Sequence, residues 1–124
     1  MTDRIFKVKP CSQKSHPNSW NRGYFWCPGC NQLHAVNIDI TRPPEQDTWT
    51  YNGNENAPTL LESVRVHWGE PVDPTDLQTE LFERVCHSQV TDGKIMFYGD
   101  CNSHNLQGQT LPLPPLPSWF LRDN

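Results

Sequence analysis

Four cysteines have the residue type and spacing to bind one metal ion. Cys27 and Cys30 flank Pro28-Gly29, and this C-x-x-C spacing is typical of a zinc knuckle, in which a tight turn points two thiolates at one ion. Cys86 and Cys101 come much later in the sequence and would be brought to the knuckle by the fold. Four thiolates close the coordination shell of Zn²⁺, so the predicted site is structural.

Other ligand sets fit the same ion. In the main alternative His104 replaces Cys86, because Cys101 and His104 have a C-x-x-H spacing that resembles a second knuckle. A further alternative uses His87 or His34 as a ligand. The sequence therefore predicts a zinc site and leaves its ligand set open between these combinations.

A redox role for the Cys27 and Cys30 pair fits the sequence less well. A thioredoxin-like C-x-x-C opens a helix within a βαβ unit, whereas this motif lies in a β-rich, Pro-rich chain. The chain has 5 cysteines, and this odd number fits four ligands and one spare thiol better than a set of disulfides. Cys11 has no partner at ligand spacing and is the predicted spare thiol.

Three titratable side chains are left beside the predicted metal ligands. They are His87, Asp100 and His104, and a carboxylate next to imidazoles is the equipment of general acid–base catalysis. Ser88 is near in sequence, but strand alternation predicts that it points away from His87. A structural role competes with catalysis, since histidines near zinc often bind the ligand sulfurs and Asp100 could cap a turn.

The second half of the chain predicts a central β-hairpin. Two β-favouring runs, residues 84–91 and 94–101, are separated by Asp92-Gly93, the strongest short signal for a two-residue type I′ turn. Such a turn fixes which residues are opposite one another. The expected pairs are Thr91 with Lys94, Val90 with Ile95, Ser88 with Phe97, His87 with Tyr98, and Cys86 with Gly99.

This register sorts the side chains onto two faces, because alternate residues of a strand point to opposite sides. Cys86 and Cys101 become diagonal neighbours on one face, together with Ser88. His87 and Asp100 become diagonal neighbours on the other face. Metal binding and acid–base chemistry are therefore predicted on opposite sides of one hairpin.

Composition limits the fold and its partners. A length of 124 residues with 35% hydrophobic residues predicts one small domain. The 12 prolines and 7 glycines predict that much of this domain consists of turns and loops. The net charge of −4 argues against broad binding to nucleic acid or anionic membrane. Without a signal sequence or an apolar span, a cytoplasmic protein is expected.

The remaining segments complete the predicted fold. A helix of roughly ten residues is expected from Asp73-Pro74 through Leu77, Leu81 and Phe82, because Asp precedes Pro at the first helical position. Residues 10–22 are predicted as loop. Strands are expected where apolar and polar residues alternate or β-favouring residues cluster, at residues 4–9, 24–26, 35–40, 49–51 and 63–68.

These elements predict a mainly β, zinc-ribbon-like fold. It is expected to be a single zinc-stabilised domain over residues 1–124, with the central hairpin and one short helix. The Pro-rich residues 111–124 should form an extended tail packed on that domain. The alternative for the tail is an exposed ligand for an SH3-like domain.

Around the hairpin the sequence resembles a family of small proteins from tailed phages and prophages. The likeness spans residues 26–113 and implies a phage setting without a settled activity. Its later motifs are Cys86-His87-Ser88, Asp92-Gly93, Ile95, Phe97, Asp100-Cys101, His104, Leu106 and Gly108-Gln109-Thr110. Its earlier motifs are Cys27-Pro28-Gly29-Cys30, His34, Trp49, Asn52-Gly53 and Pro58-Thr59.

A fainter likeness points to a different class of function. Through Cys86-His87-Ser88 and Asp92-Gly93-Lys94-Ile95 the chain is similar to a bacterial domain found with ubiquitin-like conjugation genes and thought to be a peptidase. The first resemblance favours a phage or prophage accessory protein that binds a host or phage protein in the host cytoplasm. The second favours a zinc-stabilised hydrolase or peptidase using His87 and Asp100. Oligomeric state is left open.

Overall fold

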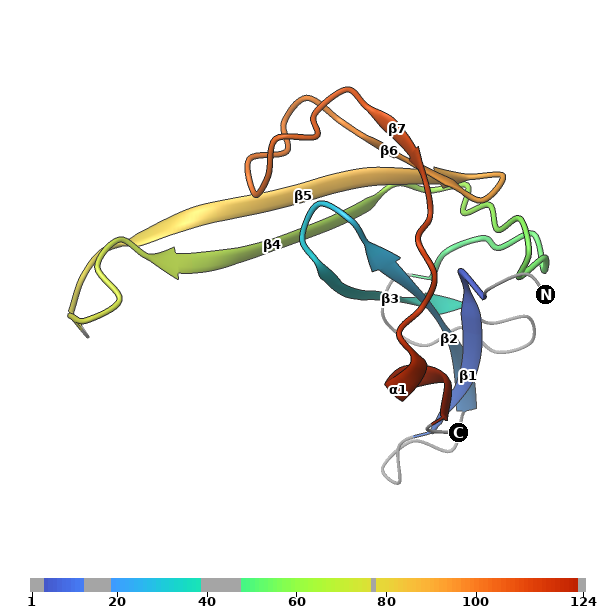
Figure 1. Cartoon of the computed structure of the whole chain (residues 1–124). Helices are drawn as coiled ribbons and strands as arrows, with labels where there is room; N and C mark the ends of the chain where they lie inside the picture. Colours follow the sequence, from blue (N-terminus) through green and yellow to red (C-terminus); the bar gives the residue numbers. More distant parts are fainter. Residues whose placement is uncertain (1–3, 13–18, 39–47, 77, 123–124) are drawn as a thin grey trace.

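The computed structural model describes residues 4–12, 19–38, 48–76 and 78–122 of the chain. Within these ranges the strands form two antiparallel sheets, which confirms the mainly β prediction (Figure 1). The first sheet has the order β1 (Lys7–Ser12), β2 (Ser19–Cys27), β3 (Gln32–Ile38). The second has the order β4 (Val64–Pro71), β5 (Leu81–Thr91), β6 (Lys94–Phe97), β7 (Thr110–Pro112).

The central hairpin has the predicted register. β5 and β6 are joined by Asp92 and Gly93, whose φ angles of 52° and 78° are the positive values that a type I′ turn needs. Thr91 pairs with Lys94 and Ser88 with Phe97, and the Tyr98 amide still donates to the His87 carbonyl over 2.9 Å. The ladder ends there, because β6 stops at Phe97 and the chain turns before Gly99 reaches Cys86.

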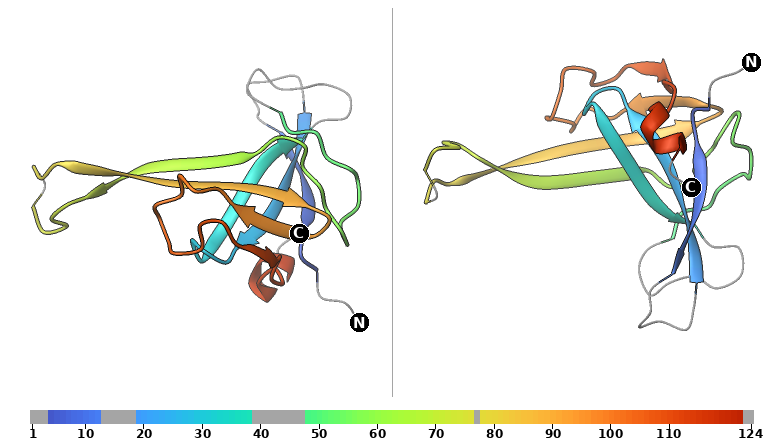
Figure 2. Two further views of the ribbon diagram at one scale, coloured as in Figure 1. Left: turned by 90° about the horizontal axis from the view of Figure 1, so that it is seen from above. Right: turned by 60° about the horizontal axis from the view of Figure 1, so that its bottom comes forward.

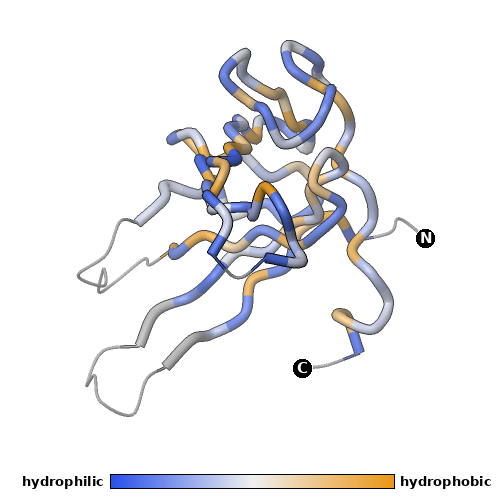
Figure 3. Tube along the Cα trace, turned by 90° about the vertical axis from the view of Figure 1, so that its left-hand side faces the viewer, coloured by the Kyte–Doolittle hydropathy of each residue, from blue (hydrophilic) through white to orange (hydrophobic). Residues whose placement is uncertain are grey.

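The two faces of this hairpin are sorted as expected. Cys86, Ser88 and Phe97 are buried on the inner face, whereas His87 and Tyr98 on the outer face are half-buried. The hydropathy of the trace changes from residue to residue along the strands, as this alternation requires (Figure 3). The inner face meets the first sheet and supplies Cys86, Val90, Ile95 and Phe97 to the core.

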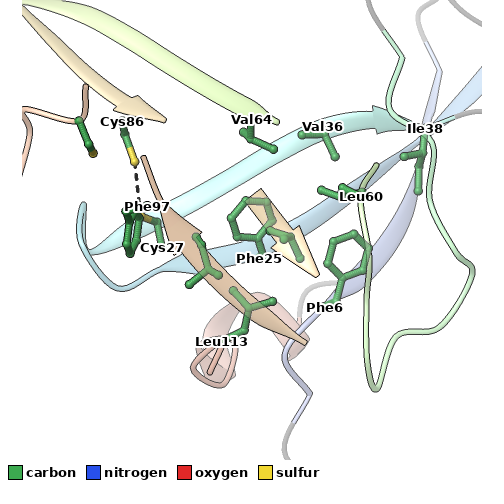
Figure 4. Close-up of a cluster of buried hydrophobic side chains, with 13 residues drawn as sticks. Phe6, Phe25, Cys27, Val36, Ile38, Leu60, Val64, Cys86, Phe97 and Leu113 are labelled. Carbon is green, nitrogen blue, oxygen red and sulfur yellow. Dashed lines mark hydrogen bonds between the residues drawn. The ribbon is translucent and has the colours of Figure 1, made fainter. Parts of the chain in front are cut away.

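The core lies between the two sheets (Figure 4). Phe6 and Phe25 come from the first half of the chain, and Phe97 comes from β6. All three are fully buried, and burial of each such side chain contributes about 1.5–3 kcal/mol to the free energy of unfolding. At one end of this core the sulfurs of Cys27 and Cys86 face each other, so the hydrophobic core runs directly into the predicted metal site.

The predicted helix at Asp73 is wrong. Asp73 instead starts a turn, in which its carboxylate accepts the Thr75 amide and its carbonyl accepts the Asp76 amide. The chain then enters β5, where Leu81 pairs with Pro71 of β4. Asp followed by Pro is compatible with an Asx turn as well as with the start of a helix. The turn forms here because the residues that follow it pair as β5 with β4. Leu77 of the predicted helix lies outside the described residues.

Strands β4 and β5 continue beyond the four-stranded part of the sheet as a two-stranded arm (Figure 2). The pairing of β5 with β6 covers Ser88–Thr91, whereas its pairing with β4 reaches out to Leu81. The outer arm exposes Leu81 and Val72. Leu81 and Phe82, which were predicted to form part of the apolar face of a helix, are thus exposed on a β-strand.

Other predicted elements differ mainly in their ends. The strand predicted at residues 35–40 is part of β3, and its last two residues lie outside the described part. Strands extend into the segment predicted as loop at 10–22, of which residues 13–18 are not described. The strand predicted at 49–51 is reduced to one bridge, between Tyr51 and Leu60.

The Pro-rich tail lies along the domain. β7 pairs with β6, and beyond it the Leu116 amide donates to the Arg4 carbonyl. Leu113, Leu116 and Phe120 are buried against the rest of the chain. A short helix, α1 (Ser118–Arg122), lies in the tail, so within the described ranges the one short helix is found there rather than near Asp73. Among the described residues no helix is long and apolar enough to cross a membrane.

We predict that Gly23→Ala destabilises the protein. Gly23 lies in β2 under the ring of Phe6, and a Cβ atom there would overlap that ring. Overpacking of this kind costs about 1–3 kcal/mol in the free energy of unfolding, measured by denaturant titration. Gly99→Ala is the matched control, since a Cβ at Gly99 meets no atom within 4 Å. Equal stability of the two variants would contradict this description of the core.

Candidate active site and metal centre

His87 and Asp100 are in direct contact on the outer face of the hairpin. Nδ1 of His87 lies 3.0 Å from Oδ1 and 3.2 Å from Oδ2 of Asp100. The side chain of His87 is 21% exposed and that of Asp100 is 53% exposed. The carboxylate accepts a hydrogen bond from Nδ1–H, which leaves Nε2 as the unprotonated, basic nitrogen of the ring.

The basic nitrogen of His87 faces a serine that the sequence analysis did not identify. Oγ of Ser63 lies 2.9 Å from Nε2 of His87. Ser63 directly precedes β4, and Arg65 pairs with His87, so Ser63 is a diagonal neighbour of His87 on the outer face. Ser63, His87 and Asp100 thus form one continuous chain of hydrogen bonds.

The imidazole of His87 is held by its neighbours as well as by Asp100. The ring of Tyr98 stacks on it, with centroids 4.3 Å apart and planes 29° apart. The Tyr98 hydroxyl donates to Oε1 of Gln89 over 3.2 Å, and the Gln89 amide nitrogen donates to the carbonyl of Leu60. This network connects the base to the segment that carries the serine.

Ser63 is held from the other side by residues 48–50. The indole Nε1 of Trp49 donates to the carbonyl of Ser63 over 3.0 Å. The neighbouring carboxylate of Glu62 accepts hydrogen bonds from the backbone amide and the hydroxyl of Thr50, at 2.7 and 2.9 Å. The hydrogen bond from the amide is the main cause that lowers the pKa of Glu62. The segment before β4 is therefore fixed on both sides of Ser63.

Ser88 and His104 lie away from this chain of hydrogen bonds. Ser88 is fully buried on the inner face, and its Oγ has no hydrogen-bond partner among the described residues. His104 lies at the predicted metal site, where Nε2 is 3.2 Å from Sγ of Cys101 and 3.7 Å from Sγ of Cys86. Of the three predicted acid–base residues, the structure thus joins His87 to Asp100 and places His104 with the sulfurs.

The knuckle, β3 and β5 together supply a group of four ligand atoms that could hold a metal ion. The donor atoms of Cys27, Cys30, His34 and Cys86 all lie within 4.8 Å of one another. Sγ of Cys27 and Sγ of Cys86 are 3.8 Å apart, close to the separation of about 3.8 Å between two sulfurs bound tetrahedrally to Zn²⁺. The amide of Cys30 donates to Sγ of Cys27 over 3.3 Å, as expected for a turn built around a thiolate.

A second group adjoins the first and shares Cys86 with it. Its members are Cys86, Cys101 and His104. Gly29 allows the two groups to meet, because a Cβ at Gly29 would overlap the imidazole of His104. Three of the four predicted ligands are thus in the first group together with His34, while Cys101 lies in the adjoining one.

The sulfurs strongly affect one another's ionisation. Hydrogen bonds from Cys27 and Cys86 lower the pKa of Cys30, whereas the neighbouring Cys27 and Cys30 raise the pKa of Cys86. Burial opposes a charge on His34, but the sulfurs of Cys27 and Cys30 outweigh it and raise the pKa of His34 to about 9. Close thiolates repel one another, and a divalent cation at their centre would remove that repulsion.

The comparison with protein-family models is decisive for the class of the protein. Residues 7–98 match the model of the bacterial ubiquitination-like system serine protease (BubE) family. The chain belongs to this family. The match includes Ser63 and His87 and ends two residues before Asp100. No curated protein and no solved structure matches the chain.

Membership in the BubE family supports one of the two resemblances. The fainter likeness, to a peptidase-like domain found with ubiquitin-like conjugation genes, is confirmed. The likeness to a phage family is not confirmed by this match. The description of the family names a serine protease, and within the matched residues Oγ of Ser63 lies 2.9 Å from Nε2 of His87.

We predict that His87→Ala keeps the metal site intact. His87 lies on the opposite face of β5 from Cys86, and its hydrogen-bonding partners are Asp100 and Ser63. Loss of these bonds should cost about 1–2 kcal/mol in stability, with the same zinc content per chain by elemental analysis. Loss of the metal from this variant would show that His87 is a ligand and that this assignment of faces is wrong.

Proposed function

We propose that this protein is a serine protease whose catalytic residues are Ser63, His87 and Asp100. The observation that carries the proposal is the pair of contacts made by one imidazole: Nε2 to Oγ of Ser63 at 2.9 Å and Nδ1 to Asp100 at 3.0 Å. This is the arrangement of nucleophile, base and orienting acid by which serine proteases are recognised on unrelated folds. The BubE family description independently supports the same class.

The chemistry follows from the two nitrogen atoms of His87. Nε2 takes the proton of Ser63 as Oγ attacks the carbonyl carbon of the substrate, which forms a tetrahedral intermediate. The imidazolium then gives that proton to the leaving amine as the peptide bond breaks, and an acyl group remains on Ser63. A water molecule, deprotonated by the same nitrogen, releases the acid and restores the serine.

Asp100 fixes the tautomer and the orientation of the base. With Nδ1–H bound to the carboxylate, the lone pair of Nε2 points at Ser63, and the negative charge stabilises the imidazolium that forms. Stacking on Tyr98 restricts rotation of the ring. The site is open to solvent at Asp100, so a protein substrate can approach it along the surface.

Zinc fits this function as a structural ion. Cys86 lies on the inner face of β5, and the donor atoms of Cys27, Cys30 and His34 lie within 4.8 Å of its sulfur. The serine and the base lie on the outer face, so an ion at this group would touch neither the nucleophile nor the substrate. A shell of thiolates and imidazole with four protein ligands has no free position for water. The family description supports a ubiquitination-like system as the setting. We propose a protein of that system as the substrate.

A binding role in phage infection, which the first resemblance implied, has less support. The Pro-rich tail, for which binding to an SH3-like domain was the alternative, buries Leu113, Leu116 and Phe120 against its own domain. No contact in the described part of the chain favours that role over hydrolysis. A protein partner is proposed here only as the substrate.

We predict that a fluorophosphonate probe labels Ser63. The probe reacts with a serine only when a neighbouring base removes its proton, so the adduct should be found on Ser63 by peptide mass spectrometry. Ser63→Ala should lose the label completely. Ser88→Ala is the matched control and should keep it, because Ser88 lies buried on the other face. Labelling that persists in Ser63→Ala would exclude Ser63 as the nucleophile.

We also predict graded losses of turnover when the base and its acid are changed. His87→Ala should lower kcat for a protein substrate by on the order of a hundredfold or more. Asp100→Asn should lower kcat strongly too, because the amide N–H of Asn can donate to Nδ1 of His87, which leaves the ring proton on Nε2 and favours the wrong tautomer. KM should change little in both variants. Full activity in either one would contradict its assigned role.

A further inference from the structure

We propose that Cys27, Cys30, His34 and Cys86 bind one Zn²⁺ ion, and that this ion positions the catalytic His87 and Asp100 from the reverse face of the hairpin. The ligand set stands on the geometry of the inner face alone. The positioning role rests in addition on the proposed protease function. Neither role requires the ion to contact the substrate.

His34 has the burial and the position of a fourth ligand. His34 is 4% exposed, and its Nε2 is buried with no hydrogen-bond partner among the described residues. An unpaired buried imidazole nitrogen costs free energy, and binding a cation removes that cost. The donor atom of His34 lies within 4.8 Å of three sulfurs, which gives a complete set of four donors. Cys101, predicted from the sequence as the fourth ligand, remains the alternative.

The donor set selects the metal. Three thiolates and one imidazole are soft and borderline ligands, which favour Zn²⁺ over Mg²⁺ or Ca²⁺. The four ligands come from both sheets. Cys27 ends β2, Cys30 lies in the turn that follows it, and His34 lies in β3 of the same sheet, whereas Cys86 lies in β5 of the other sheet. The ion therefore crosslinks the two sheets at the open end of the core, where Cys27 and Cys86 meet in Figure 4.

Coupling to the base follows from sequence adjacency. Cys86 and His87 are consecutive residues of β5, so a ligand and the base share one peptide bond and point to opposite faces. Fixing Sγ of Cys86 restricts the backbone twist of β5 at the residue that carries the base. On the side of β6 the paired ladder ends at Phe97 with Ser88, and the Tyr98 amide continues it with one hydrogen bond to the His87 carbonyl.

Coupling to the acid runs through the second group. Cys101 directly follows Asp100, and its sulfur lies 3.2 Å from Nε2 of His104, which is also 3.7 Å from Sγ of Cys86. The turn that carries Asp100 is also held by hydrogen bonds, among them the Cys101 amide to the Tyr98 carbonyl, the Gln107 side chain to the Cys101 carbonyl, and the Asn102 amide to the Val85 carbonyl of β5. One imidazole thus ties the acid's turn to a metal ligand.

Access to the ion is open on one side. A cavity of about 520 Å³ lies beside Cys30, between the knuckle and the inner face of β4, where Trp68 lines it. A chelator or a replacement ion can therefore reach the site without unfolding the domain. This makes exchange of the metal practical as an experiment on the folded protein.

The first experiment tests the ligand set with two pairs of matched variants of the full chain. Zinc content and cobalt absorption spectra are measured for His34→Ala and His104→Ala, and for Cys86→Ser and Cys101→Ser. We expect His34→Ala and Cys86→Ser to weaken zinc binding at least a hundredfold, while the other two keep one zinc per chain. Metal loss in Cys101→Ser with retention in His34→Ala would overturn the ligand set in favour of four cysteines.

The second experiment tests positioning with the metal site filled. ¹¹³Cd²⁺ replaces Zn²⁺ in the wild type, and its larger radius should shift Cys86 while the chain stays folded by circular dichroism. We expect kcat and the rate of Ser63 labelling by a fluorophosphonate to fall on the order of tenfold to a hundredfold. KM should stay nearly constant, and the ¹¹³Cd NMR shift should report three sulfur ligands.

Cys101→Ser provides a second probe that keeps the shell intact. It should bind zinc normally and still lose on the order of tenfold in kcat, because the turn that carries Asp100 is loosened. Unchanged kcat in both the cadmium-loaded protein and this variant would overturn the positioning role. If zinc-loaded wild type does not label at Ser63, the proposed function fails instead, and the metal-content results still decide the ligand set.

Discussion

The alternation of side chains along β5 is the constraint on which the rest of the structure depends. Cys86 points into the space between the sheets, where sulfurs and imidazoles gather, and His87 points to the surface, where it meets Ser63 and Asp100. A shift of one residue would exchange the two side chains. It would bury the base among thiols and expose a metal ligand, so both sites would be lost together.

This arrangement suits a small domain with a limited core. Fewer than half of the residues are hydrophobic, and several segments run as turns and Pro-rich chain. Such a domain gains much from a metal crosslink, because binding of the ion adds directly to the free energy of folding. On the inner face an ion bound at this site would join the sheets together with Phe97, while on the outer face Ser63 lies beside His87.

The sequence was sufficient for features set by local signals and insufficient for those set by distant pairing. Asp92-Gly93 predicted the register of β5 with β6, and with it the contact of His87 with Asp100. Ser63 was missed because the long connection between β4 and β5 gives no register from sequence, so nothing placed Ser63 opposite His87. The same connection was misread as a helix. His34 was an open alternative, since its approach to three sulfurs depends on how the two sheets meet.

The most direct test of this account is a crystal structure of the zinc-loaded protein after reaction with a phosphonate inhibitor. We expect phosphorus bonded to Oγ of Ser63 and within reach of His87, and an anomalous zinc peak at bonding distance from Sγ of Cys86. The two centres should lie on opposite faces of β5. A zinc ion bound to His87, or phosphorus on another serine, would contradict the division of the hairpin into a metal face and a catalytic face.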